Sequence, residues 1–187
     1  MILLSALILL FGSASYIVGI KKMFEGKYLP SVFSRAVWLM LSAISFAGVV
    51  SSGSTKSSIL LAGVFLAGNA AICLASFWRG TKELGMMELI CFFILMLSGI
   101  VWFVFDSPLI SLAVSLLAHF VGGVPTYKKV WNKPQTESAG FWSLFFVASV
   151  LSIVASWGQP LSLLIFPIYF AVFDGAMTIL ALRRVKV

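Results

Sequence analysis

The chain has 187 residues, of which 61% are hydrophobic and only 10% are charged. Soluble domains carry about 25% charged residues, so this composition excludes an ordinary soluble fold and indicates a surface that meets lipid. The formal net charge of +7 suits a nucleic-acid partner only where cations form a patch on a folded surface, whereas here they lie in short segments between long apolar runs. We therefore expect membrane lipid as a partner, and no nucleic acid.

Seven apolar stretches follow one another, each close to the roughly 20 residues that a helix needs to cross the hydrocarbon of a bilayer. This pattern predicts an all-α protein with seven transmembrane helices. The first stretch carries its lysines after the apolar run, which is the reverse of a signal peptide and favours a retained helix. The predicted helices cover residues 2–20, 36–52, 57–78, 84–105, 108–124, 140–157 and 161–182.

The cations are distributed unevenly over the segments between these stretches. Twelve of the 13 lysines and arginines follow odd-numbered stretches, and only Lys56 lies on the other side. Because short loops rich in Lys and Arg stay in the cytoplasm, we expect the N-terminus outside, the C-terminus in the cytoplasm, and a bacterial inner (cell) membrane as the location. The twelve are Lys21, Lys22, Lys27, Arg35, Arg79, Lys82, Lys128, Lys129, Lys133, Arg183, Arg184 and Lys186.

The stretches divide as three, one and three, and the two triplets resemble each other. A pair of lysines follows the first stretch of each triplet, at 21–22 and at 128–129, and Trp38 and Trp142 open the second stretches. Equivalent stretches are four apart, so both triplets cross in the same direction and form a parallel repeat. The predicted organisation is a three-helix bundle over residues 1–80, a linker helix over 81–107 and a second three-helix bundle over 108–187.

The segment GGVPTYKKVW at 122–131, followed by Ser138, resembles the PQ-loop signature of the SWEET and SemiSWEET sugar transporters. The family usually has glutamine after the proline, where this chain has Thr126, and Val18 replaces the proline in the first triplet. The resemblance implies an alternating-access transporter of a small polar solute, with a sugar as the expected solute. A proline kinks a helix, so Pro125 with Gly122 and Gly123 is a predicted hinge, unless Pro125 merely ends its helix.

Polar side chains near the centre of a bilayer are costly, and each needs a partner or a purpose. Asn69 and Asp174 both fall near the middle of their stretches, at nearly equivalent positions of the two triplets. The resemblance implies that Asn69 contacts the sugar and that Asp174 stands where a second asparagine would be. The alternatives are an interhelical hydrogen bond for Asn69 and proton binding for Asp174.

Three more residues complete the predicted site. The resemblance places Ser52 and Trp157 beyond the asparagines, where an indole would stack on a sugar ring, although Trp157 also suits an interfacial anchor. His119, the one histidine, is either a proton relay with Asp174 or a residue satisfied within the bundle.

The sequence contains no recognisable nucleophile with a base, phosphate loop or metal cluster, so we expect neither an enzyme nor a cofactor or metal. Besides a sugar transporter, two hypotheses stay open. One is a proton-coupled amino-acid or vitamin carrier on the same scaffold, and the other is a receptor or assembly subunit that binds without transport. The oligomeric state stays open, and an oligomer is compatible with each of these hypotheses.

Overall fold

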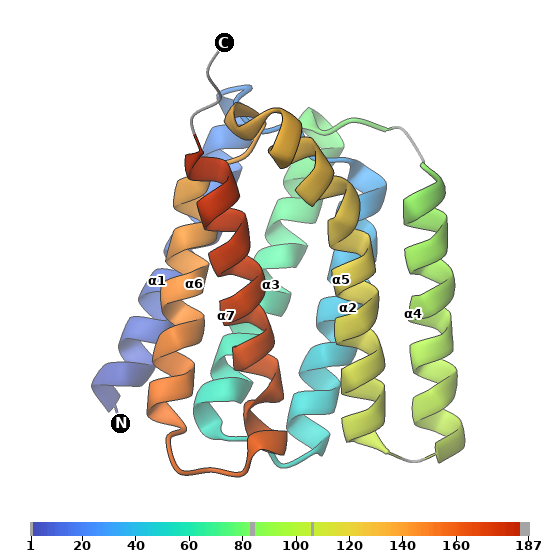
Figure 1. Ribbon diagram of the computed structural model, residues 1–187, viewed down its shortest axis with the longest axis vertical. Helices are drawn as coiled ribbons and strands as arrows, with labels where there is room; N and C mark the ends of the chain where they lie inside the picture. Colours follow the sequence, from blue (N-terminus) through green and yellow to red (C-terminus); the bar gives the residue numbers. More distant parts are fainter. Residues whose placement is uncertain (1, 83–84, 106, 184–187) are drawn as a thin grey trace.

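The computed structural model describes residues 2–82, 85–105 and 107–183. Over these ranges the chain forms seven α-helices, one short 3-10 helix and no β-strand, which confirms the predicted all-α fold (Figure 1). The elements are α1 (Ile2–Phe24), α2 (Val32–Ser51), α3 (Lys56–Arg79), α4 (Met86–Phe105), α5 (Pro108–Asn132), η1 (Pro134–Thr136), α6 (Ala139–Ala155) and α7 (Leu161–Leu182).

Several helices end at other residues than the apolar runs suggested. α1 continues through its lysine pair to Phe24, and α5 continues past the expected end at residue 124 to Asn132. The alternative that Pro125 simply ends its helix is therefore wrong, while the side chain of Pro125 lies outside the described part of the chain. α6 stops at Ala155, so Trp157 belongs to the following turn.

The apolar character of the helices fits a transmembrane protein. Within the described ranges, α1, α2, α3 and α7 are long and apolar enough to cross a membrane, and α6 is a shorter apolar helix of 17 residues. In hydrocarbon every backbone polar group must find its partner inside the segment, which a continuous helix provides.

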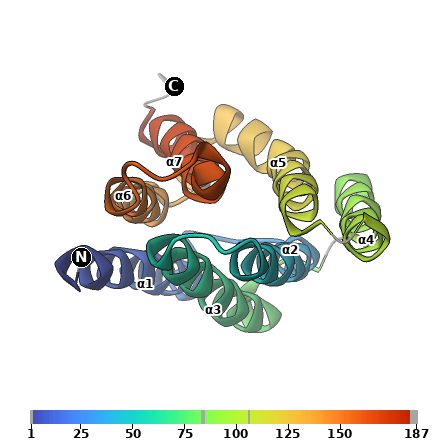
Figure 2. The ribbon, with the colours of Figure 1, turned by 90° about the horizontal axis from the view of Figure 1, so that it is seen from below.

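The helices form two facing sets of three, with one helix outside them (Figure 2). α3 contacts both α1 and α2, and α7 contacts both α5 and α6. Across the interface α1 packs on α6 and α2 packs on α5, while α4 lies against α5 and α2. Exchanging α1 with α5, α2 with α6 and α3 with α7 leaves the main pattern of neighbours unchanged.

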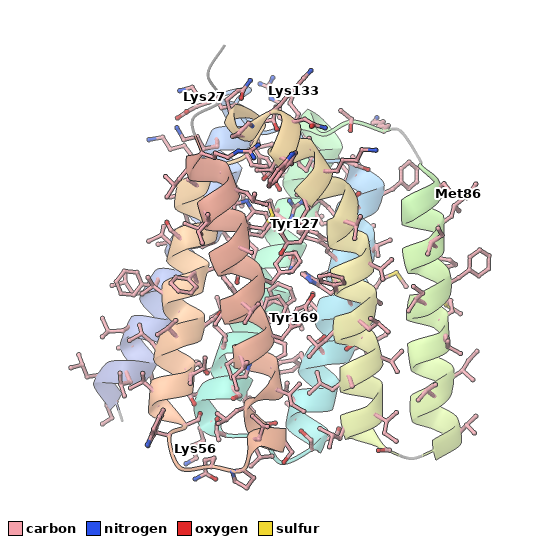
Figure 3. The ribbon with its side chains drawn as sticks, viewed as in Figure 1. Lys27, Lys56, Met86, Tyr127, Lys133 and Tyr169 are labelled. Atoms are coloured by element: carbon pink, nitrogen blue, oxygen red, sulfur yellow. The ribbon has the colours of Figure 1, made fainter. Side chains whose placement is uncertain are left out.

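Lysines and arginines gather at one end of the bundle. Lys27 and Lys133 lie at this end, which we call the basic end, and Lys56 opens α3 at the opposite end, which we call the Lys56 end (Figure 3). Among the twelve cations expected in the cytoplasm, Arg184 and Lys186 lie outside the described residues. The others lie at or near the basic-end termini of the helices.

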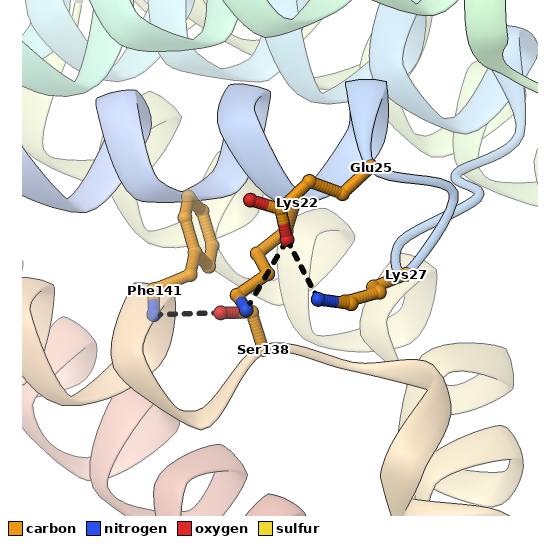
Figure 4. Close-up of polar contacts among 5 residues, drawn as sticks. All are labelled: Lys22, Glu25, Lys27, Ser138 and Phe141. Carbon is orange, nitrogen blue, oxygen red and sulfur yellow. Dashed lines mark hydrogen bonds and ion pairs between the residues drawn. The ribbon is translucent and has the colours of Figure 1, made fainter.

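An exposed ion-pair cluster follows α1 at the basic end (Figure 4). The Lys27 ammonium donates to a Glu25 carboxylate oxygen at 3.0 Å, and the Lys22 ammonium lies 3.5 Å from the same oxygen. The hydrogen bond from Lys27, together with the charges of both lysines, lowers the pKa of Glu25. Exposed pairs of this kind contribute little to stability, so the cluster is a surface feature of the loop.

Hydroxyl side chains precede α2, α3, α5 and α6. Thr55 accepts a hydrogen bond from the backbone N–H of Ser58 at 3.2 Å, and Ser138 accepts one from the N–H of Phe141 at 3.3 Å (Figure 4). Each cap satisfies one of the N–H groups that the first turn of a helix leaves without a partner. These caps explain where the helices begin, which the apolar pattern alone does not determine.

The contact between α1 and α3 depends on a glycine. A Cβ atom added at Gly68 would lie 2.1 Å from Tyr16 Cδ2, so the tyrosine ring rests directly on the α3 backbone. A Cβ added at Gly63, on the same helix, would meet Phe46 at an ordinary 3.5 Å. The position of Tyr16 is therefore set by the missing side chain at residue 68.

Gly68→Ala should destabilise the protein, because the new methyl group must displace Tyr16 or separate the two helices. Overpacking of this kind costs about 1–3 kcal/mol, which lowers the unfolding midpoint by roughly 2–4 °C per kcal/mol in a chain of this size. The measurement is thermal unfolding in detergent, with Gly63→Ala as the matched control. Equal midpoints for the two variants would contradict the packing.

Candidate functional site

A small cavity lies at the interface between the two helix sets, and we call it the central cavity. Its volume is about 10 Å³, roughly the space that one water molecule needs. Its walls are mostly aromatic, with Trp38 of α2 and Trp142 of α6 among them. Its polar and charged lining residues, apart from the Tyr16 hydroxyl, are Arg35, Asn69, His119 and Asp174.

Asn69 reaches this cavity as predicted, but its amide nitrogen already has partners. Nδ2 donates to the Tyr16 hydroxyl at 3.2 Å and to the Phe65 carbonyl at 2.9 Å. The Tyr16 hydroxyl in turn donates to the Phe65 carbonyl at 3.3 Å. This closed set of bonds joins α3 to α1 and favours the structural alternative for Asn69 in the present arrangement.

Asp174 also reaches the cavity, but unlike Asn69 it has a side-chain atom without a hydrogen-bond partner. The residue is only 2% exposed, and its Oδ2 atom is buried with no hydrogen-bond partner. A buried carboxylate oxygen without a partner is costly in a low-dielectric interior. The carboxyl group is therefore an acceptor that a donor entering the cavity would satisfy.

His119 lies in the same cavity, although the hydrogen bonds of the described residues do not join it to the predicted relay partner Asp174. Its Nδ1 shares a 2.9 Å hydrogen bond with the Tyr169 hydroxyl of α7. Its ring lies against Trp38, with centroids 4.9 Å apart and planes 31° apart. The residue is thus held by α7 and α2, and its link to Asp174 remains a prediction.

Arg35 is a residue of the site that the sequence did not single out. The apolar pattern placed it among the loop cations, whereas α2 starts at Val32 and includes it. Arg35 is 4% exposed, its Cζ lies 4.6 Å from the Trp38 ring centroid, and Nη1 is buried without a hydrogen-bond partner. Two features of the sequence indicate that Arg35 faces inward. Ser31 caps α2 ahead of it, and Trp38 follows three residues later on the same face of the helix.

A second pocket opens at the basic end, and we call it the vestibule. It has a volume of about 180 Å³ and shares Arg35 and Trp38 with the central cavity. Thr126, the residue after Pro125, is one of its lining residues. The side chains of Arg35 and Trp38 therefore line both pockets.

One wall of the vestibule is held by a buried carboxylate. Glu137 accepts a hydrogen bond from the Lys129 ammonium of α5 at 2.6 Å and another from the Trp142 indole N–H at 3.3 Å. The Trp142 ring meets Trp38 edge to face, with centroids 6.2 Å apart. The loop between α5 and α6 is thus tied to the two tryptophans that line the central cavity.

Hydroxyl groups close the Lys56 end. Ser57 and Ser156 share a hydrogen bond at 2.5 Å, and Thr55 shares one with Ser156 at 2.6 Å, so α3 is joined to the end of α6. Pro167 inside α7 has no N–H for the Leu163 carbonyl. That carbonyl accepts from the Ser58 hydroxyl of α3 at 3.4 Å, which links α7 to the same cluster.

Ser52 and Trp157 lie away from the central cavity, contrary to the expected position above Asn69. The Ser52 hydroxyl donates to the Val49 carbonyl in the last turn of α2 at 3.2 Å and shares a bond with Ser54, in the turn that follows, at 3.0 Å. Trp157 is 83% exposed because α6 ends before it. The exposed indole suits the interfacial-anchor alternative.

The predicted hinge residues lie within α5. Gly123 is buried, and a Cβ there would come within 2.7 Å of the Phe173 ring, so it permits close contact between α5 and α7. Gly122 is half-buried in the same helix. Bending at these residues stays a prediction.

The fold and the site define an all-helical protein, with apolar helices fit to cross a membrane, around a buried polar cavity. No protein-family model, curated protein or solved structure matches the chain. The resemblance to the PQ-loop family therefore stays a prediction from residues 122–131 and Ser138.

Asn69→Ala and Tyr16→Phe remove the same bond between α3 and α1. We expect each to lower the free energy of unfolding by roughly 0.5–2 kcal/mol. The double variant should cost less than the sum of the two, because the second change has no bond left to break. Unfolding midpoints in detergent for the four proteins test this, and strictly additive losses would contradict the bond.

Proposed function

We propose that the chain is an integral membrane transporter of a small polar solute, working by alternating access between two parallel three-helix bundles. The observation that carries this proposal is the central cavity itself. Its buried polar groups lie between the two helix sets, where relative movement of the sets would expose them first to one end and then to the other.

The arrangement of the helices supports a 3+1+3 parallel repeat. The neighbours of α1, α2 and α3 correspond to those of α5, α6 and α7, with α4 outside as the linker. Trp38 and Trp142, which the repeat makes equivalent, touch each other across the interface, as residues near a pseudo-twofold axis must. The turns after α2 and α6 each contain a glycine with positive φ, Gly53 at 68° and Gly158 at 83°.

The two ends of the bundle differ in a way that suits this mechanism. The Lys56 end is closed by hydrogen bonds between hydroxyl groups, each worth only about 0.5–1.5 kcal/mol net, so the closure is reversible. The basic end has an open vestibule that shares the lining residues Arg35 and Trp38 with the cavity. We infer a state that is closed at the Lys56 end and open at the basic end.

The concentration of cations supports a cytoplasmic basic end, in a bacterial inner membrane. Single cysteines test this orientation. With Lys56→Cys and Lys133→Cys made separately in a Cys73→Ser, Cys91→Ser background, a membrane-impermeant maleimide should label the first in intact cells and the second only after permeabilisation. The reverse labelling would contradict the orientation.

The resemblance to SWEET proteins favours a sugar as solute, and Asp174 with His119 favours a proton-coupled amino-acid or vitamin carrier. A stabilisation screen of the purified protein against sugars, amino acids and vitamins identifies the solute, and flux into reconstituted vesicles then separates the hypotheses. Facilitated sugar diffusion should ignore a pH gradient, whereas proton-driven uptake should be lost in Asp174→Asn. Binding without flux would indicate a receptor and contradict transport.

Locking the Lys56 end should stop transport. Ser57→Cys with Ser156→Cys, in the background without Cys73 and Cys91, puts two thiols where two oxygens lie 2.5 Å apart, close to the roughly 2 Å sulfur–sulfur distance of a disulfide. Oxidation should abolish flux and reduction should restore it. Each single variant is the control and should transport under both conditions, and continued flux through the cross-linked protein would contradict alternating access.

A further inference from the structure

A basic and an acidic side chain line the central cavity without pairing. Arg35 and Asp174 are both more than nine-tenths buried. Among the described residues, no ion pair joins them. Arg35 Nη1 and Asp174 Oδ2 each lack a hydrogen-bond partner. A buried guanidinium and a buried carboxyl group that leave each other unpaired are unusual, because pairing is the ordinary way to offset the cost of burying such groups.

The two groups lie at different depths. Arg35 comes three residues after the first residue of α2, and Asp174 comes eight residues before the last residue of α7. Measured from the basic ends of the two helices at 1.5 Å per residue, these positions are about 5 Å and about 12 Å deep. The guanidinium therefore borders both the vestibule and the cavity, and the carboxyl group lies farther in.

We propose, on the basis of the transport function above, that the solute is a zwitterion of the α-amino-acid class, with its carboxylate on Arg35 and its ammonium on Asp174. A carboxylate accepts two parallel hydrogen bonds from a guanidinium, which is the group that Arg35 presents at the inner end of the vestibule. An ammonium donates to the unpaired oxygen of Asp174. Because the central cavity has room for about one water molecule, such a solute enters as the two helix sets move apart, and it then satisfies both orphan atoms.

A neutral sugar fits the same groups less well. Its hydroxyls would bond to Arg35 and Asp174 but would bring no charge opposite to that of the guanidinium. The face of an indole is the usual platform for a sugar ring, yet Trp38 already contacts the Arg35 guanidinium and the His119 ring. The polar chemistry of the cavity thus selects for two opposite charges on one small molecule.

The test compares chemically blocked ligands on the unaltered protein. Glycine, L-alanine and L-leucine are each measured free, as the N-acetyl acid and as the methyl ester, with D-glucose alongside, by shifts in thermal unfolding of the purified protein. We expect a free amino acid to bind and both blocked forms to bind about 10- to 100-fold more weakly, because each loses one charge-assisted contact. Tighter binding of glucose, or equal binding of free and blocked forms, would overturn the proposal.

Two variants assign the ends of the ligand. Arg35→Gln should remove the preference for the free acid over the ester, and Asp174→Asn should remove the preference for the free amine over the N-acetyl form. Arg79→Gln and Glu25→Gln are the matched controls on exposed residues and should keep both preferences. If a variant does not fold, the ligand series on the unaltered protein still decides the proposal.

Flux measured on the same preparations keeps the two proposals separate. Free amino acids that bind selectively but do not cross the vesicle membrane would leave the zwitterion site standing and overturn transport. Transport of glucose, unaffected by Arg35→Gln, would leave the transporter standing and overturn the zwitterion.

Discussion

Polar groups buried between the two helix sets constrain the rest of the molecule, since each one must find a partner or remain at a cost. Asn69 Nδ2 is hydrogen-bonded to Tyr16 and to the α3 backbone. Arg35 Nη1 and Asp174 Oδ2 have no hydrogen-bond partner. The interface therefore combines a fixed polar link within one helix set with two unsatisfied groups that line the cavity, one from each set.

This difference separates structure from function in the site. Bonds such as that between Asn69 and Tyr16 hold helices of the same set together, and Gly68 allows the close approach that the bond requires. Between the sets, the contacts include hydroxyl pairs at the Lys56 end, aromatic edges near Trp142 and a buried hydrogen bond from the Ser15 hydroxyl of α1 to the Phe141 carbonyl of α6 at 2.7 Å. The hydroxyl pairs are individually weak, whereas alternating access would require the close packing of α1 on α6 to rearrange.

The sequence predicted the features that depend on hydrocarbon and on charge distribution, namely the helices and a basic end. It brought Asn69, His119 and Asp174 to one cavity because each is a polar residue within an apolar run. It missed Arg35, since a cation beside a run reads as a loop residue unless the Ser31 cap is noticed. It misplaced Trp157 and the end of α5, because helix ends depend on caps and on contacts between helices, which apolar length does not encode.

Distances between spin labels at both ends of the bundle test relative movement of the two helix sets most directly. One pair replaces Lys56 and Gln159 at the Lys56 end, and the other replaces Lys27 and Lys133 at the basic end, with the protein in lipid nanodiscs. Adding a solute that stabilises the protein should lengthen one distance and shorten the other. Two distances that stay unchanged, or that change in the same sense, would contradict alternating access.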